Sequence, residues 1–175
     1  MKTFYDLVKH RRSIRKYLDK PVEAEKIAAI LRTALMSPAS KRSNGWEFVV
    51  VDNRDRLANL SACREFGSKF VAEAPLAIVV AYDADKSDIW YEDASIAAIL
   101  IQLAAADLDL GSCWVQVHKR QYNEQTTAEE YVKKELQIPE NLRVLCMITI
   151  GYKDEERKPY DEEKLLYEKI HHNQY

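Results

Sequence analysis

One stretch of this sequence constrains the fold more than any other: residues 90–107 read as a helix with almost no polar face. Apolar side chains occur at nearly every position from Ala94 to Ala106, so they point in all directions around the helix axis. A helix that is apolar all round must be buried, yet a chain of 175 residues has little interior in which to enclose one. We therefore expect a second subunit to cover part of this helix. The alternative is a central helix that lies wholly inside one monomer.

Composition narrows the class of protein further. Apolar residues make up 47% and charged residues 31%, which is typical of a globular chain with a single domain over residues 1–175. Lysine and arginine (26) nearly balance aspartate and glutamate (28), which argues against a nucleic-acid partner. The three cysteines show no paired motif, no signal-like stretch opens the chain, and no apolar run reaches the ~20 residues that span a bilayer. We expect a cytoplasmic protein with no membrane partner and, since the histidines lack ligand spacing, no metal site.

Regular elements must occupy most of the chain, because only four glycines and five prolines interrupt it. Helical periodicity and capping signals predict a short helix after Thr3 and longer helices over 23–36, 54–66, 90–107 and 128–136. Short apolar or β-branched runs predict strands over 48–51, 76–80, 113–117 and 142–152. Helices and strands that alternate in this way indicate an α/β or α+β domain with helices packed on a central sheet.

A cluster of cations follows the first helix. Arg11, Arg12 and Arg15 flank a hydroxyl at Ser13, and guanidinium groups bind phosphate through paired hydrogen bonds. The cluster is too small for nucleic acid, so a single phosphate monoester is the better-sized ligand. The alternative is a solvated basic turn.

Two further segments have the composition of ligand-binding loops. Residues 37–46 join a predicted helix to a predicted strand through small and polar residues, which offer donors and acceptors to the polar edge of a ring. The alternative is a plain connector with Asn44-Gly45 as its turn. Gly111, before a predicted strand, lets the backbone approach a flat ligand closely. A structural turn explains Gly111 equally well.

Taken together, these segments resemble the nitroreductase family of flavoproteins over essentially the whole chain. The matching motifs are RRSxRxY at Arg11–Tyr17, SPxSxxxxxW at Ser37–Trp46, Ala74-Pro75-Leu76, the helix opening Asp93–Ala98, the turn Leu110–Trp114, and Ile150–Tyr152 followed by Arg157–Asp161. The resemblance implies an α+β fold, a three-layer α/β/α sandwich whose central sheet is mixed and mostly antiparallel.

The resemblance also implies an activity and a site. The family's members are homodimers that bind FMN at the subunit interface, take hydride from NADH or NADPH, and reduce a small-molecule electron acceptor such as a nitroaromatic or a quinone. The flavin carries the chemistry, so no catalytic side chain is implied. The implied cofactor-binding residues are Arg11, Arg12, Ser13, Arg15, Pro38, Ala39, Ser40, Arg42, Asn44, Cys113, Trp114, Gln116 and Arg157. Alternatives are a flavin-dependent dehalogenase or enone reductase on the same fold, or a flavin-binding protein without turnover.

The chain departs from the family pattern beside the expected flavin. Arg42 stands where the family often has Asn, and Asn44-Gly45 stands where it often has Gln-Pro. Substrate preference therefore does not transfer from other members. We also expect residues 153–175 to wrap the partner subunit, the alternative being a frayed tail.

Overall fold

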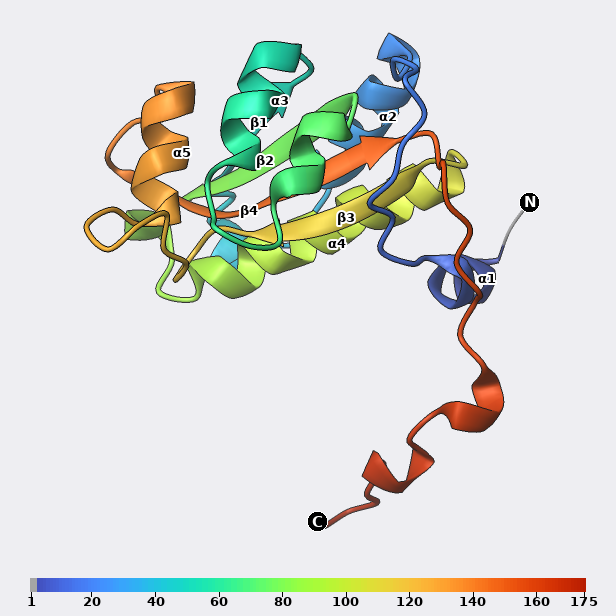
Figure 1. Cartoon of the computed structure of the whole chain (residues 1–175). Helices are drawn as coiled ribbons and strands as arrows, with labels where there is room; N and C mark the ends of the chain where they lie inside the picture. Colours follow the sequence, from blue (N-terminus) through green and yellow to red (C-terminus); the bar gives the residue numbers. More distant parts are fainter. Residues whose placement is uncertain (1–2) are drawn as a thin grey trace.

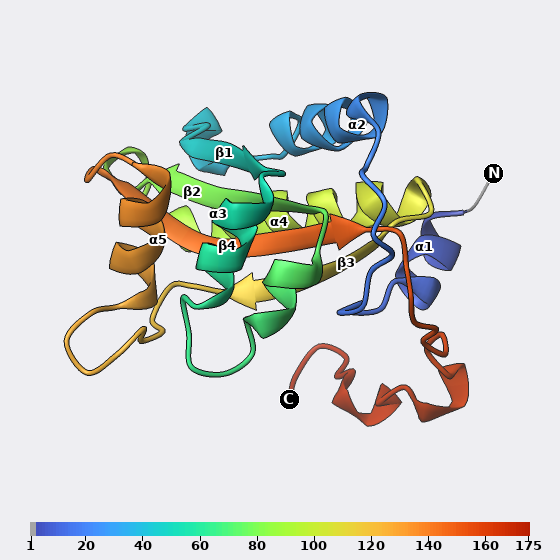
Figure 2. The same cartoon turned by 45° about the horizontal axis from the view of Figure 1, so that its top comes forward.

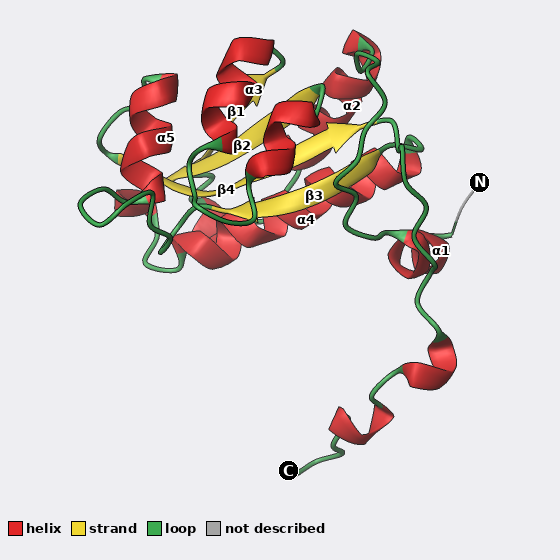
Figure 3. Cartoon of the chain, viewed as in Figure 1, coloured by secondary structure: helices red, strands yellow, loops and turns green. Residues whose placement is uncertain are grey.

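Four apolar segments pair into one sheet with the spatial order β1-β2-β4-β3. The computed structural model describes residues 3–175. The strands are β1 (Trp46–Val51), β2 (Leu76–Asp83), β3 (Gly111–Gln116) and β4 (Leu142–Gly151). The helices are α1 (Phe4–His10), α2 (Ala24–Leu35), α3 (Arg54–Ser61), α4 (Trp90–Asp107) and α5 (Ala128–Leu136). Every predicted helix and strand is present, with some shifts in its ends (Figure 3).

The sheet lies between two helical layers. Along β2, Leu76, Ile78 and Tyr82 belong to the core shared with α2 and α4, whereas Ala77 and Val79 belong to the core shared with α3 and α5. Successive side chains of a strand point to opposite faces of the sheet, so this central strand is buried on both. Figure 2 shows α3 and α5 on one side of the sheet and α4 on the other. The predicted three-layer sandwich is confirmed.

The sheet is more uniform than expected. Within residues 3–175 every pair of named strands is antiparallel. The parallel component is a single isolated bridge between Ser13 and Ser112, which joins the segment after α1 to the edge strand β3. The expected mixed sheet is therefore antiparallel in all four strands.

Helix α4 has the limits predicted for it and runs along the sheet (Figure 1). Ala94, Ala98 and Ile101 are fully buried in the core between α4 and the sheet. On the same helix Ile96 is 39% exposed and Ile99 is 38% exposed. The alternative of a helix enclosed by one chain is therefore wrong, because a single chain leaves part of its apolar surface in solvent.

Helix α3 and the tail differ from what local sequence signals predict. Helix α3 ends at Ser61 and not at Phe66: the hydroxyl of Ser68 donates to the carbonyl of Ser61 (2.7 Å), and the chain between them turns back through Gly67 in the left-handed region (φ 83°). After β4 the chain leaves the body of the molecule through two short turns, Glu162–Lys164 and Tyr167–Lys169 (Figure 1). Exposed apolar residues continue along this tail, with Ile170 61% exposed. Among the helices described, none combines the length and the apolar character needed to cross a membrane.

Candidate functional site

A cavity of about 980 Å³ opens where the segment after α1 meets the chain that follows β4. Its volume lies in the range of small-molecule sites, roughly 300–1,000 Å³. The lining comes from α1 and the segment after it, the end of α4, the start of β3, and the chain after β4. The lining residues are Asp6, Leu7, His10, Arg11, Arg12, Ile14, Ala106, Leu110, Gly111, Ser112, Lys153, Asp154, Glu155, Glu156 and Arg157.

Backbone hydrogen bonds hold the walls of this cavity together. The N–H of Leu18 donates to the carbonyl of Tyr152 (2.9 Å), and the N–H of Asp154 donates to the carbonyl of Lys16 (3.0 Å). The N–H of Ile14 donates to the carbonyl of Ser112 at the start of β3 (3.0 Å). These bonds place the basic segment between the edge of the sheet and the tail, which no local pattern in the sequence predicts.

Three arginines predicted as phosphate ligands line the cavity: Arg11, Arg12 and Arg157. Arg11 donates to Gln102 of α4 at 3.5 Å, and Arg12 donates to a tail carbonyl while its guanidinium lies 4.8 Å from the centroid of the Tyr160 ring. A guanidinium has five N–H donors, so these contacts orient the groups and leave donors for a ligand.

Glu155 is a site residue that the sequence reasoning missed. It accepts hydrogen bonds from the N–H groups of Arg15 (2.6 Å) and Lys16 (3.2 Å), and its other oxygen pairs with Arg157 at 2.6 Å. The Arg15 N–H, with help from the Arg157 guanidinium, holds the pKa of Glu155 below its ordinary value. An acidic residue in the charged run 153–158 gives no local signal of this role, since its partners lie at the other end of the chain.

Ser13 and Arg15 are not among the residues that line the cavity. Ser13 forms the bridge to Ser112, and the Arg15 guanidinium lies 5.7 Å from the centroid of the Phe70 ring. Cys113 is buried behind this segment with 1% exposure, and burial raises the pKa of its thiol. A buried, protonated thiol is a packing residue.

Gly111 packs against the segment that follows α1. A Cβ at this position would lie 2.8 Å from the side chain of Ile14. This packing supports the structural explanation of the glycine, and the close approach of a flat ligand at Gly111, which lines the cavity, stays a prediction.

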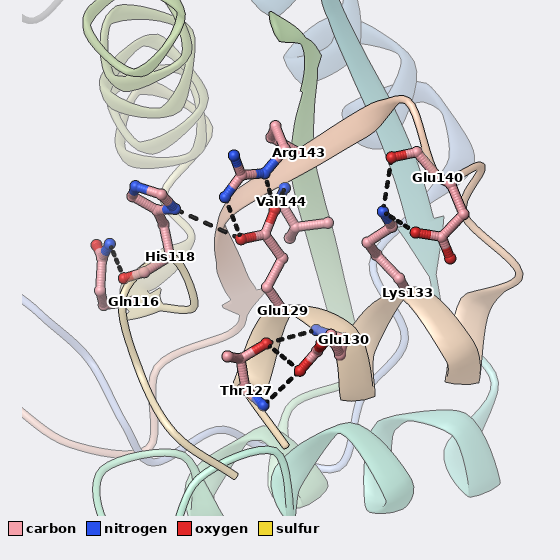
Figure 4. Close-up of polar contacts among 9 residues, drawn as sticks. All are labelled: Gln116, His118, Thr127, Glu129, Glu130, Lys133, Glu140, Arg143 and Val144. Carbon is pink, nitrogen blue, oxygen red and sulfur yellow. Dashed lines mark hydrogen bonds and ion pairs between the residues drawn. The ribbon is translucent and has the colours of Figure 1, made fainter. Parts of the chain in front are cut away.

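Trp114 and Gln116 form a hydrogen-bonded pair on β3. The Trp114 indole N–H donates to Gln116 Oε1 (2.8 Å), and Gln116 Nε2 donates to the carbonyl of His118 (2.9 Å; Figure 4). Next to His118, the buried carboxylate of Glu129 accepts a hydrogen bond from Arg143 Nε, and its Oε2 lies 3.5 Å from His118 Nδ1. This second network fixes the chain that follows β3.

The loop with Pro38, Ala39, Ser40, Arg42 and Asn44 does not line the cavity and lies near the start of α4 instead. Three residues that are not glycine adopt left-handed backbone conformations there: Lys41 (φ 52°), Arg42 (φ 56°) and Asn44 (φ 43°). Such a conformation costs about 1–2 kcal/mol per residue, less for Asn. The loop is therefore strained, and its conformation depends on contacts with the rest of the fold.

Those contacts centre on Asp93, a buried acid in the first turn of α4. Asp93 Oδ1 accepts from the Ser40 N–H (3.0 Å), and Oδ2 accepts from the hydroxyl of Tyr82 (2.8 Å). The Ser43 hydroxyl lies 2.7 Å from that of Tyr82. The Tyr82 ring in turn packs on Gly45, where an added Cβ would lie 2.4 Å from a ring carbon.

The two halves of the predicted site thus lie at different places along α4. The loop contacts Asp93, whereas Arg11 contacts Gln102, nine residues further on. At 1.5 Å per residue the two contact points are about 13.5 Å apart along the helix axis. Within residues 3–175 no cluster of three or more histidine, cysteine or acidic side chains is placed to hold a metal ion.

Comparison with known proteins identifies the family. The model of the nitroreductase family matches residues 8–66 and 56–152, which together make up most of the chain. The chain belongs to the nitroreductase family. This nitroreductase-family chain is 36% identical over 155 residues to a protein of Archaeoglobus fulgidus provisionally named an NADH dehydrogenase/NAD(P)H nitroreductase, and the match covers 86% of each.

Solved structures agree with that assignment. An FMN-dependent nitroreductase from Clostridium difficile R20291 superposes with a TM-score of 0.95 at 50% identity, covering 97% of this chain and 98% of that one. A protein of Bacteroides thetaiotaomicron with the same provisional name as the archaeal relative superposes with a TM-score of 0.89 at 37% identity, covering 98% and 97%. This nitroreductase-family chain is an oxidoreductase.

Proposed function

We propose that this chain is an FMN-dependent NAD(P)H oxidoreductase that holds the FMN phosphate in the cavity beside residues 10–14. The observation that carries the proposal is that Arg11, Arg12 and Arg157 line one cavity although they come from opposite ends of the chain. Guanidinium groups bind phosphate through paired, charge-assisted hydrogen bonds. When bound, FMN would supply hydride acceptance from the nicotinamide and electron transfer to the acceptor.

Each residue of the expected site then has a distinct task. Arg11, Arg12 and Arg157 bind the phosphate, and Glu155 orients Arg157 and holds the backbone at Arg15. Ser13 and Arg15 border the buried face of Cys113 and would contact the ribityl chain and phosphate from that side. The flavin ring would lie against the strained loop, with Pro38, Ala39, Ser40, Arg42 and Asn44, and against Trp114 and Gln116. The Ser40 N–H already donates to Asp93, so Ser40 has its hydroxyl as the remaining donor.

We also propose a homodimer in which the loop of one chain serves the flavin of its partner. The separation along α4 between Arg11 and the strained loop supports this arrangement, as do the exposed side chains of Ile96 and Ile99. Covering these side chains with a second copy would remove apolar surface from water. The tail beyond Tyr160, whose apolar residues face solvent in one chain, would lie across the partner.

The acceptor class follows from the family assignment. We expect nitroaromatics, quinones or similar small acceptors to be reduced in a ping-pong cycle, in which the oxidised nicotinamide leaves before the acceptor binds. Relatives at 36% and 34% identity have NAD(P)H nitroreductase names, which favours this activity over dehalogenation or enone reduction. Anaerobic bleaching of the bound flavin by NADH or NADPH distinguishes an enzyme from a passive flavin binder.

The decisive experiment compares FMN with riboflavin. Arg12→Ala is expected to weaken FMN binding by about 1.5–3 kcal/mol, the scale of a hydrogen bond to a charged group, and to leave riboflavin binding unchanged. Arg56→Ala is the matched control, because Arg56 lies on α3 and donates to the Glu135 carbonyl at 2.8 Å, outside the cavity. Equal affinity of the native protein for FMN and riboflavin would contradict the phosphate site.

The role of the tail has its own test. A chain that ends before Tyr160 loses the exposed apolar residues of both terminal turns and is expected to dissociate at a higher protein concentration than the full chain. Sedimentation velocity across a dilution series measures this. A truncated chain whose dimer is as stable as that of the full chain would show that the tail does not cross the partner.

A further inference from the structure

The loop that precedes β1 depends on one buried residue, Asp93. The loop over residues 39–45 is strained at Lys41, Arg42 and Asn44. Strained backbone persists only where the surrounding structure holds it, and it concentrates at functional sites. The side chain that holds this loop is Asp93, which is 3% exposed and has both carboxylate oxygens occupied by loop or loop-supporting donors.

Each bond to Asp93 restrains a different part of the loop. Oδ1 holds the Ser40 N–H just before the left-handed residues, at 3.0 Å. Oδ2 holds the Tyr82 hydroxyl, which lies 2.7 Å from the hydroxyl of Ser43 in the middle of the loop. The Tyr82 ring then closes over Gly45 at the end of the loop. Asp93 therefore restrains the beginning, the middle and, through Tyr82, the end.

Arg42 indicates that the strained shape is needed. Asn tolerates the left-handed region better than Arg does, yet this chain has Arg42 at φ 56°. Arg42 and Lys41 are both exposed, so burial of their side chains does not explain the conformation.

We propose that Asp93 is a positioning residue that fixes the 39–45 loop in the shape that meets the flavin ring. The inference rests on the proposed FMN function, because it assigns the ring, and not the phosphate, to this loop. Asp93 does not itself contact the flavin; it acts through the Ser40 N–H, through the Tyr82 hydroxyl and through the Ser43 hydroxyl, which donates to its Oδ2 at 3.4 Å. Its effect on the enzyme is therefore confined to the ring.

The first test measures the loop without any flavin. Asp93→Ala in the full chain is expected to speed amide hydrogen exchange over residues 40–44 by about tenfold or more, the factor for one lost hydrogen bond to a charged group. Amides of β2 and β4 are expected to exchange as in the native protein. Glu92→Ala is the matched control, since Glu92 is the exposed neighbouring acid in the same turn of α4. Unchanged exchange in the loop of Asp93→Ala overturns the proposal.

The second test uses Tyr82→Phe, which removes the hydroxyl and keeps the ring that packs on Gly45. It is expected to speed exchange at Ser43 and its neighbours in the same direction as Asp93→Ala. This variant also decides the question if Asp93→Ala fails to fold. A loop as protected in Tyr82→Phe as in the native chain counts against the network.

The third test assigns the loop to the ring. Asp93→Ala is expected to weaken the binding of FMN and of riboflavin by the same factor and to shift the absorption bands of the bound flavin. Arg12→Ala, in contrast, is expected to weaken the binding of FMN alone. A change in the ratio of the two affinities like that of Arg12→Ala would place Asp93 at the phosphate end and refute the assignment. If the native chain binds neither flavin, the proposed function fails, and with it the assignment to the ring, whereas the exchange data still decide whether Asp93 holds the loop.

Discussion

Glu129→Gln is expected to destabilise this protein by about 2–3 kcal/mol, while the same change at its exposed neighbour Glu130 leaves the stability nearly unchanged. Glu129 is 8% exposed at the start of α5. Its oxygens accept from Arg143 Nε (2.7 Å) and Nη2 (2.9 Å) and from the N–H of Val144 (2.9 Å; Figure 4). A glutamine has one acceptor oxygen, so its amide N–H₂ would face one of these donors.

The magnitude follows from the exposure of the two partners. Hydrogen bonds to charged groups contribute about 1.5–3 kcal/mol, and breaking a fully buried ion pair costs about 3–5 kcal/mol. The Arg143 side chain is 42% exposed, so water replaces part of the hydrogen bonding that Arg143 loses in the variant. We therefore expect a loss of about 2–3 kcal/mol in the free energy of unfolding. Glu130 caps α5 by accepting from the Thr127 N–H at 2.7 Å, a role that glutamine also fills.

Urea unfolding at equilibrium measures both variants. With an m-value of about 2–3 kcal/mol/M, Glu129→Gln should lower the midpoint by about 1 M at an unchanged m-value, and Glu130→Gln should leave it nearly in place. Equal midpoints for the two variants would refute the reasoning, because the two residues differ in burial and in partners while the substitution is the same.

The pH dependence provides a second check on Glu129. Burial by itself would raise the pKa of Glu129, but the Arg143 guanidinium and the Val144 N–H outweigh burial and hold it below 4.5. A carboxyl whose pKa is lowered in the folded state stabilises the fold above its unfolded pKa, and the contribution is lost as pH falls through the folded pKa. The gap between native protein and Glu129→Gln should therefore be full near neutral pH and shrink below pH 4.5. A gap that stays constant down to about pH 3 would show that the Glu129 charge is not its source.

Three further predictions concern the loop and the cavity. Gly45→Ala is expected to cost about 1–3 kcal/mol of unfolding free energy, measured by urea unfolding, because the new Cβ meets the Tyr82 ring at 2.4 Å; a midpoint like that of the native protein would mean that the ring moves freely. Arg42→Asn is expected to raise thermal stability by about 0.5–1 kcal/mol, since Asn accepts φ 56° at lower cost; calorimetry showing a loss would indicate that the Arg42 side chain stabilises the fold. Glu155→Ala should speed amide exchange at Arg15 by about tenfold, measured by mass spectrometry, because the carboxylate accepts that N–H at 2.6 Å; unaltered exchange there would contradict its role in holding the segment.

The elements of this fold were predictable because their signals are local. Helix α4 has the predicted limits, and the apolar runs that became β2 and β4 are the strands buried on both faces. The end of α3 was not predictable, because the residues after Ser61 are compatible with a helix, and the hydrogen bond from the Ser68 hydroxyl to the Ser61 carbonyl forms only when the chain has folded back. Which strands pair with one another was not predictable either. Hydrophobic periodicity indicates which face of a strand is buried, but it does not indicate which strands lie beside it.

The candidate site likewise contains residues that local sequence patterns identified and residues that they did not. Guanidinium groups at Arg11 and Arg12 were identified because their clustering is visible in seven consecutive residues. Glu155 was missed because its partners are the backbone of Arg15 and Lys16, at the far end of the chain. The sequence likewise gives no indication that Ser40 is held by a buried acid on α4.

The sequence by itself therefore determined the composition of each layer, the helix that one chain leaves partly exposed, and the basic motif that we propose as the phosphate site. These properties depend on residues within one or two turns of one another. Tertiary structure alone decided that Ile14 packs against Gly111, that Glu155 holds the backbone at Arg15, and that the strained loop lies about 13.5 Å along α4 from Arg11. Those outcomes depend on which strand and which tail segment pair with the residues after α1, and hydrogen bonds between distant segments settle that pairing only when the whole chain has folded.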